Sequence, residues 1–76
     1  MKTINLEGQE YMLIAELQFN GTEYLHLAKT DNPKEFCIRK INVIDGKRMI
    51  VGLDGKEEFD MALLAFRDKH IKDLEN

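Results

Sequence analysis

Short apolar segments alternate with tight-turn dipeptides along the chain up to residue 53. An acidic or amide residue precedes glycine at four places: Glu7-Gly8, Asn20-Gly21, Asp45-Gly46 and Asp54-Gly55. In such pairs the first residue tolerates a left-handed backbone and glycine adopts one freely, so the pairs favour turns between antiparallel strands. The segments between them are rich in Ile, Leu, Val, Tyr and Phe, as strands are. The pattern predicts strands near residues 2–6, 9–18, 22–29, 35–43 and 47–52.

After Asp54 the spacing of apolar residues changes to the three and four residues that are typical of a helix. Asp54 is expected to cap this helix, and Glu57 stands three residues later at the capping-box position. Five apolar residues then share one helical stripe: Phe59, Ala62, Leu63, Phe66 and Leu74. The pattern predicts one amphipathic helix, roughly residues 56–74. We therefore expect an α+β fold of one domain, residues 1–76, in which a five-stranded antiparallel meander sheet is followed by one C-terminal amphipathic helix packed on one face.

The register of the two central hairpins has two alternatives, because a one-residue slip turns every side chain to the other face of the sheet. A two-residue turn at Asn20-Gly21 would pair Leu17 with Tyr24 and divide the apolar residues between the faces. A three-residue loop that begins at Phe19 would instead gather five residues on one face: Leu13, Ala15, Leu17, Leu25 and Leu27. We favour this loop, and we expect the helix to cover the leucine-rich face.

The second hairpin gives the same result. A three-residue loop of Ile44, Asp45 and Gly46 gathers four further apolar residues on the leucine-rich face: Ile41, Val43, Met49 and Val51. The opposite face would then be half apolar, and contiguous exposed apolar surface marks interaction sites. The candidate interaction surface consists of nine residues expected on that face: Met12, Ile14, Tyr24, His26, Phe36, Ile38, Lys40, Arg48 and Ile50. The alternative is that the sheet curls like a barrel and buries part of this face.

Composition and charge narrow the class of protein. The chain has 76 residues and a mass of 8.9 kDa, with 43% hydrophobic and 33% charged residues, which is typical of one globular domain. The longest apolar run, Met61–Phe66, is too short to cross a membrane, and the first ten residues lack the apolar core of a secretion leader. The formal net charge is −3 and the excess of acidic residues follows residue 53, which disfavours duplex DNA as a partner. With one cysteine there is no internal disulfide, and we expect a cytoplasmic location.

Few residues offer catalytic chemistry. The sequence has no serine, so a serine nucleophile is excluded, and Cys37, His26 and His70 are what remains. Cys37 shares the parity of the inward-facing residues of its strand and is expected to be buried and inert, although a Cys37-dependent enzyme or redox sensor stays a third hypothesis. His70 falls in the apolar stripe of the helix and is expected either to pack there with a hydrogen bond or to act as a cation near the helix end. We expect no metal site, because no second ligand stands at a suitable spacing, and neither a cofactor nor enzymatic activity.

The leading hypothesis is therefore a small non-enzymatic protein-interaction module that binds a protein partner or a second copy of itself. An inhibitor of the phage or mobile-element type, or a self-associating regulator, would belong to this class. The alternative is single-stranded nucleic-acid binding, in which Tyr24 and Phe36 stack on bases while Lys40 and Arg48 contact phosphates.

Residues 15–66 also resemble the YrzB-type family of short firmicute proteins. The family pattern has an acid-or-amide–glycine hairpin, then a tyrosine, two aliphatic strands around an acidic turn, and an acidic helix with phenylalanine. The matching positions are Asn20, Gly21, Tyr24, Leu27, Phe36, Ile38, Phe59 and Phe66. Residues 28–53 depart from the family by being much less acidic. The resemblance implies no reaction, because the family has no assigned activity.

Overall fold

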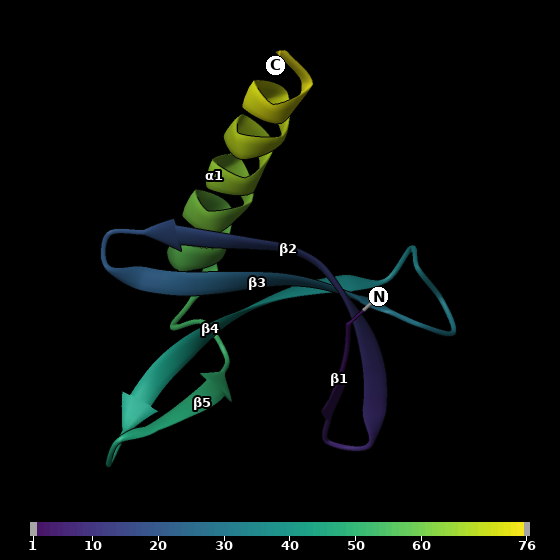
Figure 1. Cartoon of the computed structure of the whole chain (residues 1–76), viewed down its shortest axis with the longest axis vertical. Helices are drawn as coiled ribbons and strands as arrows, with labels where there is room; N and C mark the ends of the chain where they lie inside the picture. Colours follow the sequence, from purple (N-terminus) through teal and green to yellow (C-terminus); the bar gives the residue numbers. More distant parts are fainter. Residues whose placement is uncertain (1, 76) are drawn as a thin grey trace.

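Five antiparallel strands follow one another along the chain and a long helix completes it (Figure 1). The structure is a computed structural model and describes residues 2–75. The elements are β1 (Thr3–Leu6), β2 (Gln9–Phe19), β3 (Thr22–Lys29), β4 (Phe36–Ile44), β5 (Lys47–Val51) and α1 (Lys56–Glu75). The strands lie in the sheet in the order in which they occur in the sequence, so the sheet is a meander. The predicted α+β fold, with five strands followed by one C-terminal helix on the sheet, is confirmed.

The central hairpins close through two-residue turns, and the three-residue loops favoured from the sequence are wrong. Phe19 pairs with Thr22 across Asn20-Gly21, and Ile44 pairs with Lys47 across Asp45-Gly46. Both residues of the first turn have positive φ, 52° at Asn20 and 77° at Gly21. This backbone twists in the same sense as the strands that it joins, which makes it the preferred short hairpin connection. Local turn geometry therefore outweighed the grouping of apolar residues on one face.

An irregularity in β2 divides the apolar residues that were expected to lie together. Leu13 pairs with Leu27, but the next paired residue is Ala15, opposite His26, so Ile14 is the extra residue of a bulge. Directly paired residues point to the same face, and the bulge shifts the alternation by one position. Leu13 thus lies on the face of Leu27, whereas the side chains from Ala15 to Phe19 alternate in the opposite sense.

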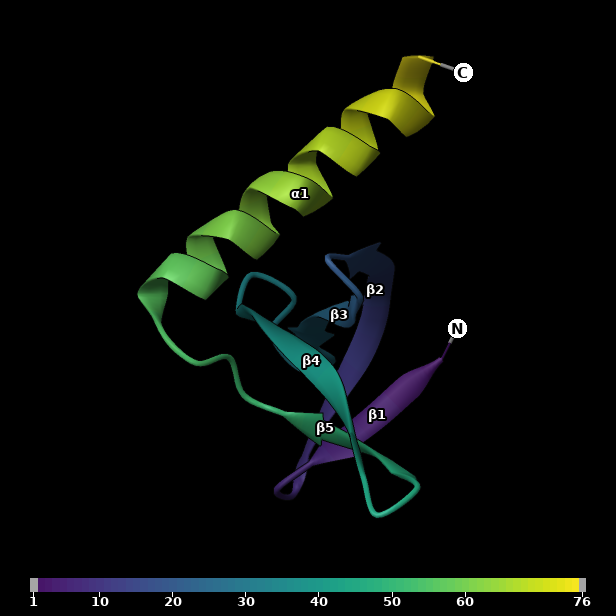
Figure 2. The same ribbon diagram turned by 90° about the vertical axis from the view of Figure 1, so that its left-hand side faces the viewer.

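The helix covers the face of the sheet that carries Tyr24 and Ile38, not the leucine-rich face, and the prediction on this point is wrong. These two side chains form the buried core with Ala62 and Phe66 of α1. Partly buried apolar residues surround it: Ala15, Leu17, Leu53, Phe59 and Met61. Figure 2 shows α1 running obliquely over this side of the strands.

The leucine-rich face is buried by the shape of the sheet itself. Leu25 and Leu27 of β3 are both buried. Their side chains point to the face opposite that of Tyr24, which α1 covers. The outer strands β1 and β5 bend away from α1 at opposite ends of the sheet, so that the sheet curls on the side opposite the helix (Figure 1). The curl considered from the sequence is therefore present, but it encloses the leucines rather than the opposite face. The chain has apolar packing on both faces of β3.

The start of α1 is fixed by a carboxylate, as expected, but from a different residue. The amide of Phe59 donates to the carbonyl oxygen of Gly55 at 3.1 Å, which begins the helical bonding. Glu58 rather than Glu57 reaches back, and its Oε1 accepts from the amide of Asp54 at 2.7 Å. Glu57 and Glu58 add negative charge in the first turn, where the helix dipole favours it.

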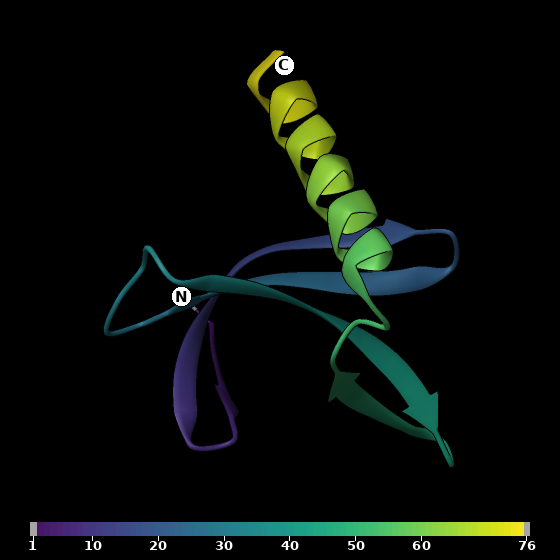
Figure 3. The same ribbon diagram turned by 180° about the vertical axis from the view of Figure 1, so that it is seen from behind.

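The C-terminal turns of α1 extend beyond the sheet (Figures 1 and 3). Leu74, which was expected in the buried stripe, keeps 72% of its surface exposed, and His70 is exposed as well. The expectation that His70 packs in the core is therefore wrong, because an open space separates α1 from the sheet at this position. Within residues 2–75, no helix is long and apolar enough to cross a membrane.

Candidate functional site

A charged cluster joins α1 to the sheet. Lys40 Nζ on β4 donates to Asp54 Oδ2 at 2.8 Å and to both carboxylate oxygens of Glu58 at 3.2 Å. The hydroxyl of Tyr24 on β3 donates to Glu58 Oε2 at 2.8 Å. The Lys40 side chain is nearly buried, and its charge is tolerated because two carboxylates surround it. The cluster holds the first turn of α1 against β3 and β4.

The cluster shifts the acid–base properties of its members. The pKa of Glu58 lies below its usual range, first because the backbone amide of Asp54 donates to it, and then because Tyr24 and Lys40 do. The hydrogen bond to Asp54 raises the pKa of Lys40, and burial followed by the contact with Glu58 raises that of Tyr24. The three shifts favour an ionised Glu58, a protonated Lys40 and a neutral Tyr24 at neutral pH.

Three members of the predicted interaction surface are therefore unavailable to a partner. Tyr24 keeps 2% and Ile38 1% of its surface exposed, and Lys40 is buried in the cluster. The prediction that they form an exposed surface is wrong because α1 covers their face. The same burial removes Tyr24 and Lys40 from the set proposed for stacking on bases and contacting phosphates.

Two other predicted members lie on the far side of the sheet. Arg48 pairs with Val43, and Ile50 with Ile41, on the face that carries the buried leucines. Arg48 Nη2 also donates to Glu23 Oε2 at 2.6 Å. The predicted register had placed both residues beside Tyr24, and the two-residue turn reverses that placement.

The remaining four predicted residues stay on the side of α1 or at its border. Met12 of β2 pairs with Ala28, so it lies on the same face as Ala28, and it is half-buried. Phe36 of β4 pairs with Ala28 from the other side and is exposed. His26 packs edge-on against Phe36, with ring centroids 5.4 Å apart, and its ring lies tilted against that of Phe66, with centroids 5.7 Å apart. Burial lowers the pKa of His26, which favours the neutral imidazole.

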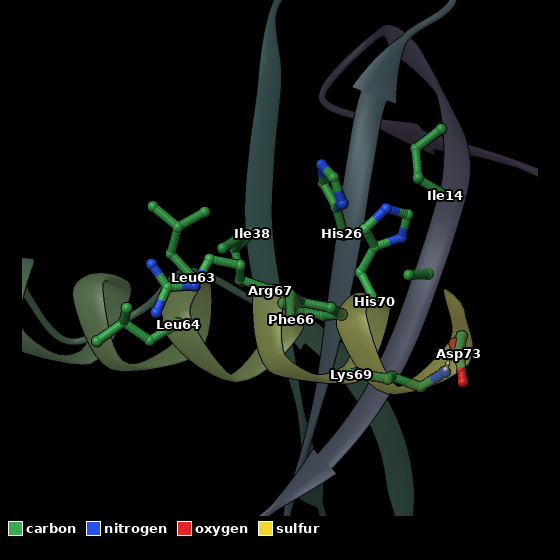
Figure 4. A pocket seen from close by; sticks show the side chains of 11 residues that line it. Ile14, His26, Ile38, Leu63, Leu64, Phe66, Arg67, Lys69, His70 and Asp73 are labelled. Carbon is green, nitrogen blue, oxygen red and sulfur yellow. Dashed lines mark hydrogen bonds and ion pairs between the residues drawn. The ribbon is translucent and has the colours of Figure 1, made fainter. Parts of the chain in front are cut away.

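Ile14 lines a groove between α1 and the sheet. Its volume is about 710 Å³. We call it the α1 groove. Its lining includes Ile14 and His26 from the sheet and Leu63, Leu64, Phe66, Arg67 and His70 from α1 (Figure 4). Because Ile14 is the bulge residue, it stands outside the regular pairing and stays 50% exposed at the mouth of the groove.

Polar groups mark the helix side of the α1 groove. His70 projects from α1 toward the sheet, whereas Arg67 extends along α1 toward Leu63 and Leu64 (Figure 4). Lys69 Nζ pairs with Asp73 Oδ2 at 3.4 Å one turn apart. Arg67 forms no ion pair with any residue in 2–75, so its guanidinium is free to meet a carboxylate from outside. The groove thus combines apolar walls with a cationic group.

The remaining chemical candidates lie elsewhere. Cys37 is half-buried and lines a second hollow of about 410 Å³ with Tyr11, Lys29 and Phe36. Burial raises the pKa of its thiol, against the opposing effects of Arg39 and Lys29. In the part of the chain that the structure describes, His, Cys, Asp and Glu form no group of three or more that could hold a metal ion.

A second stripe on α1, of which Leu64 and Arg67 line the groove, was not predicted from the sequence. Leu64, Arg67, Ile71 and Leu74 recur at spacings of three and four residues, which could have revealed a second apolar stripe. The prediction had placed Leu74 in the buried stripe with Phe59 and Phe66, which hid the second stripe. Leu64 and Ile71 are 51% and 45% exposed.

Comparison with known proteins adds no relative: no family model, no curated protein and no solved structure matches the chain. The resemblance to the YrzB-type family therefore stays an expectation from the sequence.

Proposed function

We propose that this protein is a non-enzymatic interaction module that binds another polypeptide in the α1 groove. The observation that carries the proposal is the gathering of exposed apolar side chains around that groove. Ile14 comes from the bulge of β2, and Leu63 and Leu64 come from the facing part of α1. A contiguous exposed apolar patch rimmed by polar groups is typical of a binding surface.

The composition of the groove favours a polypeptide as the ligand. Its apolar residues lie at the surface rather than in an enclosed cavity, whereas sites for small molecules enclose most of the ligand. Arg67 stands among them, and arginine is enriched in the contact regions between proteins. Aliphatic side chains of a partner would cover Ile14 and Leu64, and an acidic side chain would pair with Arg67.

This proposal replaces the surface predicted from the sequence but keeps the class of protein. An inhibitor of the phage type or a self-associating regulator would be an instance of it. The cytoplasmic location stays a prediction, which rests on the presence of a single cysteine in the sequence.

The test compares a groove variant with a matched surface variant. Ile14→Lys places a charge in the groove, and Val43→Lys does the same at an exposed valine of β4 outside it. Both variants should fold, as checked by circular dichroism. Wild type and Val43→Lys are expected to retain the same polypeptides in affinity capture, a second copy of this chain included, and Ile14→Lys is expected to lose them. Equal retention by Ile14→Lys, or no retained polypeptide with the wild type, would overturn the proposal.

A further inference from the structure

We infer that the polypeptide at the α1 groove is a second copy of this chain, whose α1 packs antiparallel against the first along the rim formed by Leu64 and Arg67. The inference rests on the proposed function, because those two residues line the groove. It adds the identity of the partner, the direction of the two helices and the residues that pair.

The first observation is an unpartnered seam on α1. Asp60, Leu64, Arg67, Ile71 and Leu74 follow one another at spacings of four, three, four and three residues. This is the spacing with which two helices pack side by side. Each of the five residues is exposed. Since the end of α1 stands clear of the sheet (Figures 1 and 3), a second helix can approach this side.

The second observation is the distribution of charge along the seam. Asp60 is its acidic residue and Arg67, seven residues later, its basic one. A parallel pair of helices in register would set each of these residues beside its own copy, so that like charges meet. An antiparallel pair brings Asp60 of each copy toward Arg67 of the other, which is the favourable arrangement.

The seam itself is self-complementary in the antiparallel direction. When two copies of the 20-residue helix overlap along their whole length, Leu64 of each lies beside Arg67 of the other, near the twofold axis. Asp60 then lies about one turn, roughly 6 Å along the axis, from the partner's Arg67, within reach of that long side chain. Neither Asp60 nor Arg67 forms an ion pair within residues 2–75 of its own copy. Two equivalent Asp60–Arg67 pairs would therefore enclose the leucines at the centre.

The inference predicts a concentration-dependent dimer that charge reversal breaks and a charge swap restores. Sedimentation equilibrium of the purified full chain, from about 1 µM to about 1 mM, measures the dimer dissociation constant. Arg67→Glu and Asp60→Lys should each weaken the dimer by about tenfold or more, because every dimer contains the altered pair twice. The double variant carrying both changes should return toward the wild-type constant.

Lys72→Glu provides the matched control. Lys72 is exposed on the same helix but projects from another side of it, so reversal of its charge should change the dissociation constant far less than Arg67→Glu does. All the altered residues are exposed, and circular dichroism should show folded variants.

Three outcomes would overturn the inference: a wild type that stays monomeric at all concentrations, an Arg67→Glu variant that dimerises as tightly as the wild type, and a double variant that stays as weak as the single ones. The first outcome together with groove-dependent capture of a foreign polypeptide would leave the proposed function standing. Monomeric behaviour with no groove-dependent capture would refute both proposals.

Discussion

Lys40 is the charged side chain on which the attachment of α1 depends. It lies between Asp54 and Glu58 at the start of the helix, and Tyr24 completes the hydrogen bonding of Glu58. A buried ion of this kind costs free energy through desolvation unless its partners compensate for it. In the described residues, no fully buried side-chain nitrogen or oxygen lacks a hydrogen-bond partner, so the Lys40 ammonium is not left unpaired. The cluster therefore specifies where α1 docks.

The depressed pKa of Glu58 predicts that acid weakens the fold. Its ordinary pKa is about 4.3 in an unfolded chain, and the folded value is lower. A carboxyl group with this direction of shift contributes stability that is fully present above the ordinary value and is lost as the pH falls through the folded value. We expect the free energy of unfolding, measured with urea at a series of pH values, to fall below about pH 4.3. Glu58→Gln should be less stable at neutral pH and should lose less on acidification; parallel losses in both proteins would contradict this role.

The burial of Ile38 predicts a large effect from a small substitution. Ile38→Ala removes a side chain enclosed by the sheet and α1, and should lower the free energy of unfolding by about 2–5 kcal/mol. Val43→Ala is the control, because Val43 is 69% exposed and should change it by no more than about 0.5 kcal/mol. Urea denaturation measures both. Similar small effects at the two positions would show that the face of Ile38 is exposed in solution.

At the scale of elements, the turns and one bulge decide which residues share a face. The two-residue turns fix the hairpin registers, and the bulge at Ile14 then shifts the alternation within β2. The apolar residues are thereby divided between two faces, and each face buries some of them. The bulge also places Ile14 at the α1 groove, so an irregularity of one strand creates part of the candidate site.

The turn at Asp45-Gly46 can be tested through its backbone. Gly46 has φ of 77°, where an alanine is strained, so Gly46→Ala should lower the free energy of unfolding by about 1 kcal/mol or more. Gly52→Ala is the control, since Gly52 has no positive φ and a Cβ there would meet nothing within 4 Å. It should change stability by at most about 0.5 kcal/mol in the same urea experiment. Equal effects would show that Gly46 does not adopt the positive φ of this turn in solution.

At the scale of the whole molecule, β3 is the centre of the structure. It pairs with β2 on one side and β4 on the other, α1 covers its Tyr24 face, and the curl of the sheet encloses Leu25 and Leu27. The edge strands β1 and β5 each have one neighbour. Stability within the molecule should therefore decrease from the centre of the sheet toward its edges.

Amide hydrogen exchange should show this gradient. We expect the slowest exchange at the paired amides of β3, because their opening requires both the helix and the curled sheet to separate. Amides of β1 and β5 should exchange faster, since an edge strand can open without the rest. Exchange in β1 or β5 as slow as in β3 would indicate that these strands are covered by something other than the described fold.

The sequence by itself determined the elements, because their signals are local. Turn dipeptides delimited the strands to within about a residue, and the change of apolar spacing after Asp54 located α1. It also placed Tyr24, His26 and Ile38 together on one face. Tertiary structure alone decided which face the helix covers, because both faces are apolar enough to be buried and counting apolar residues could not distinguish them. It likewise decided that Lys40 is buried, through partners 14 and 18 residues away, and that the end of α1 leaves the sheet to form a groove.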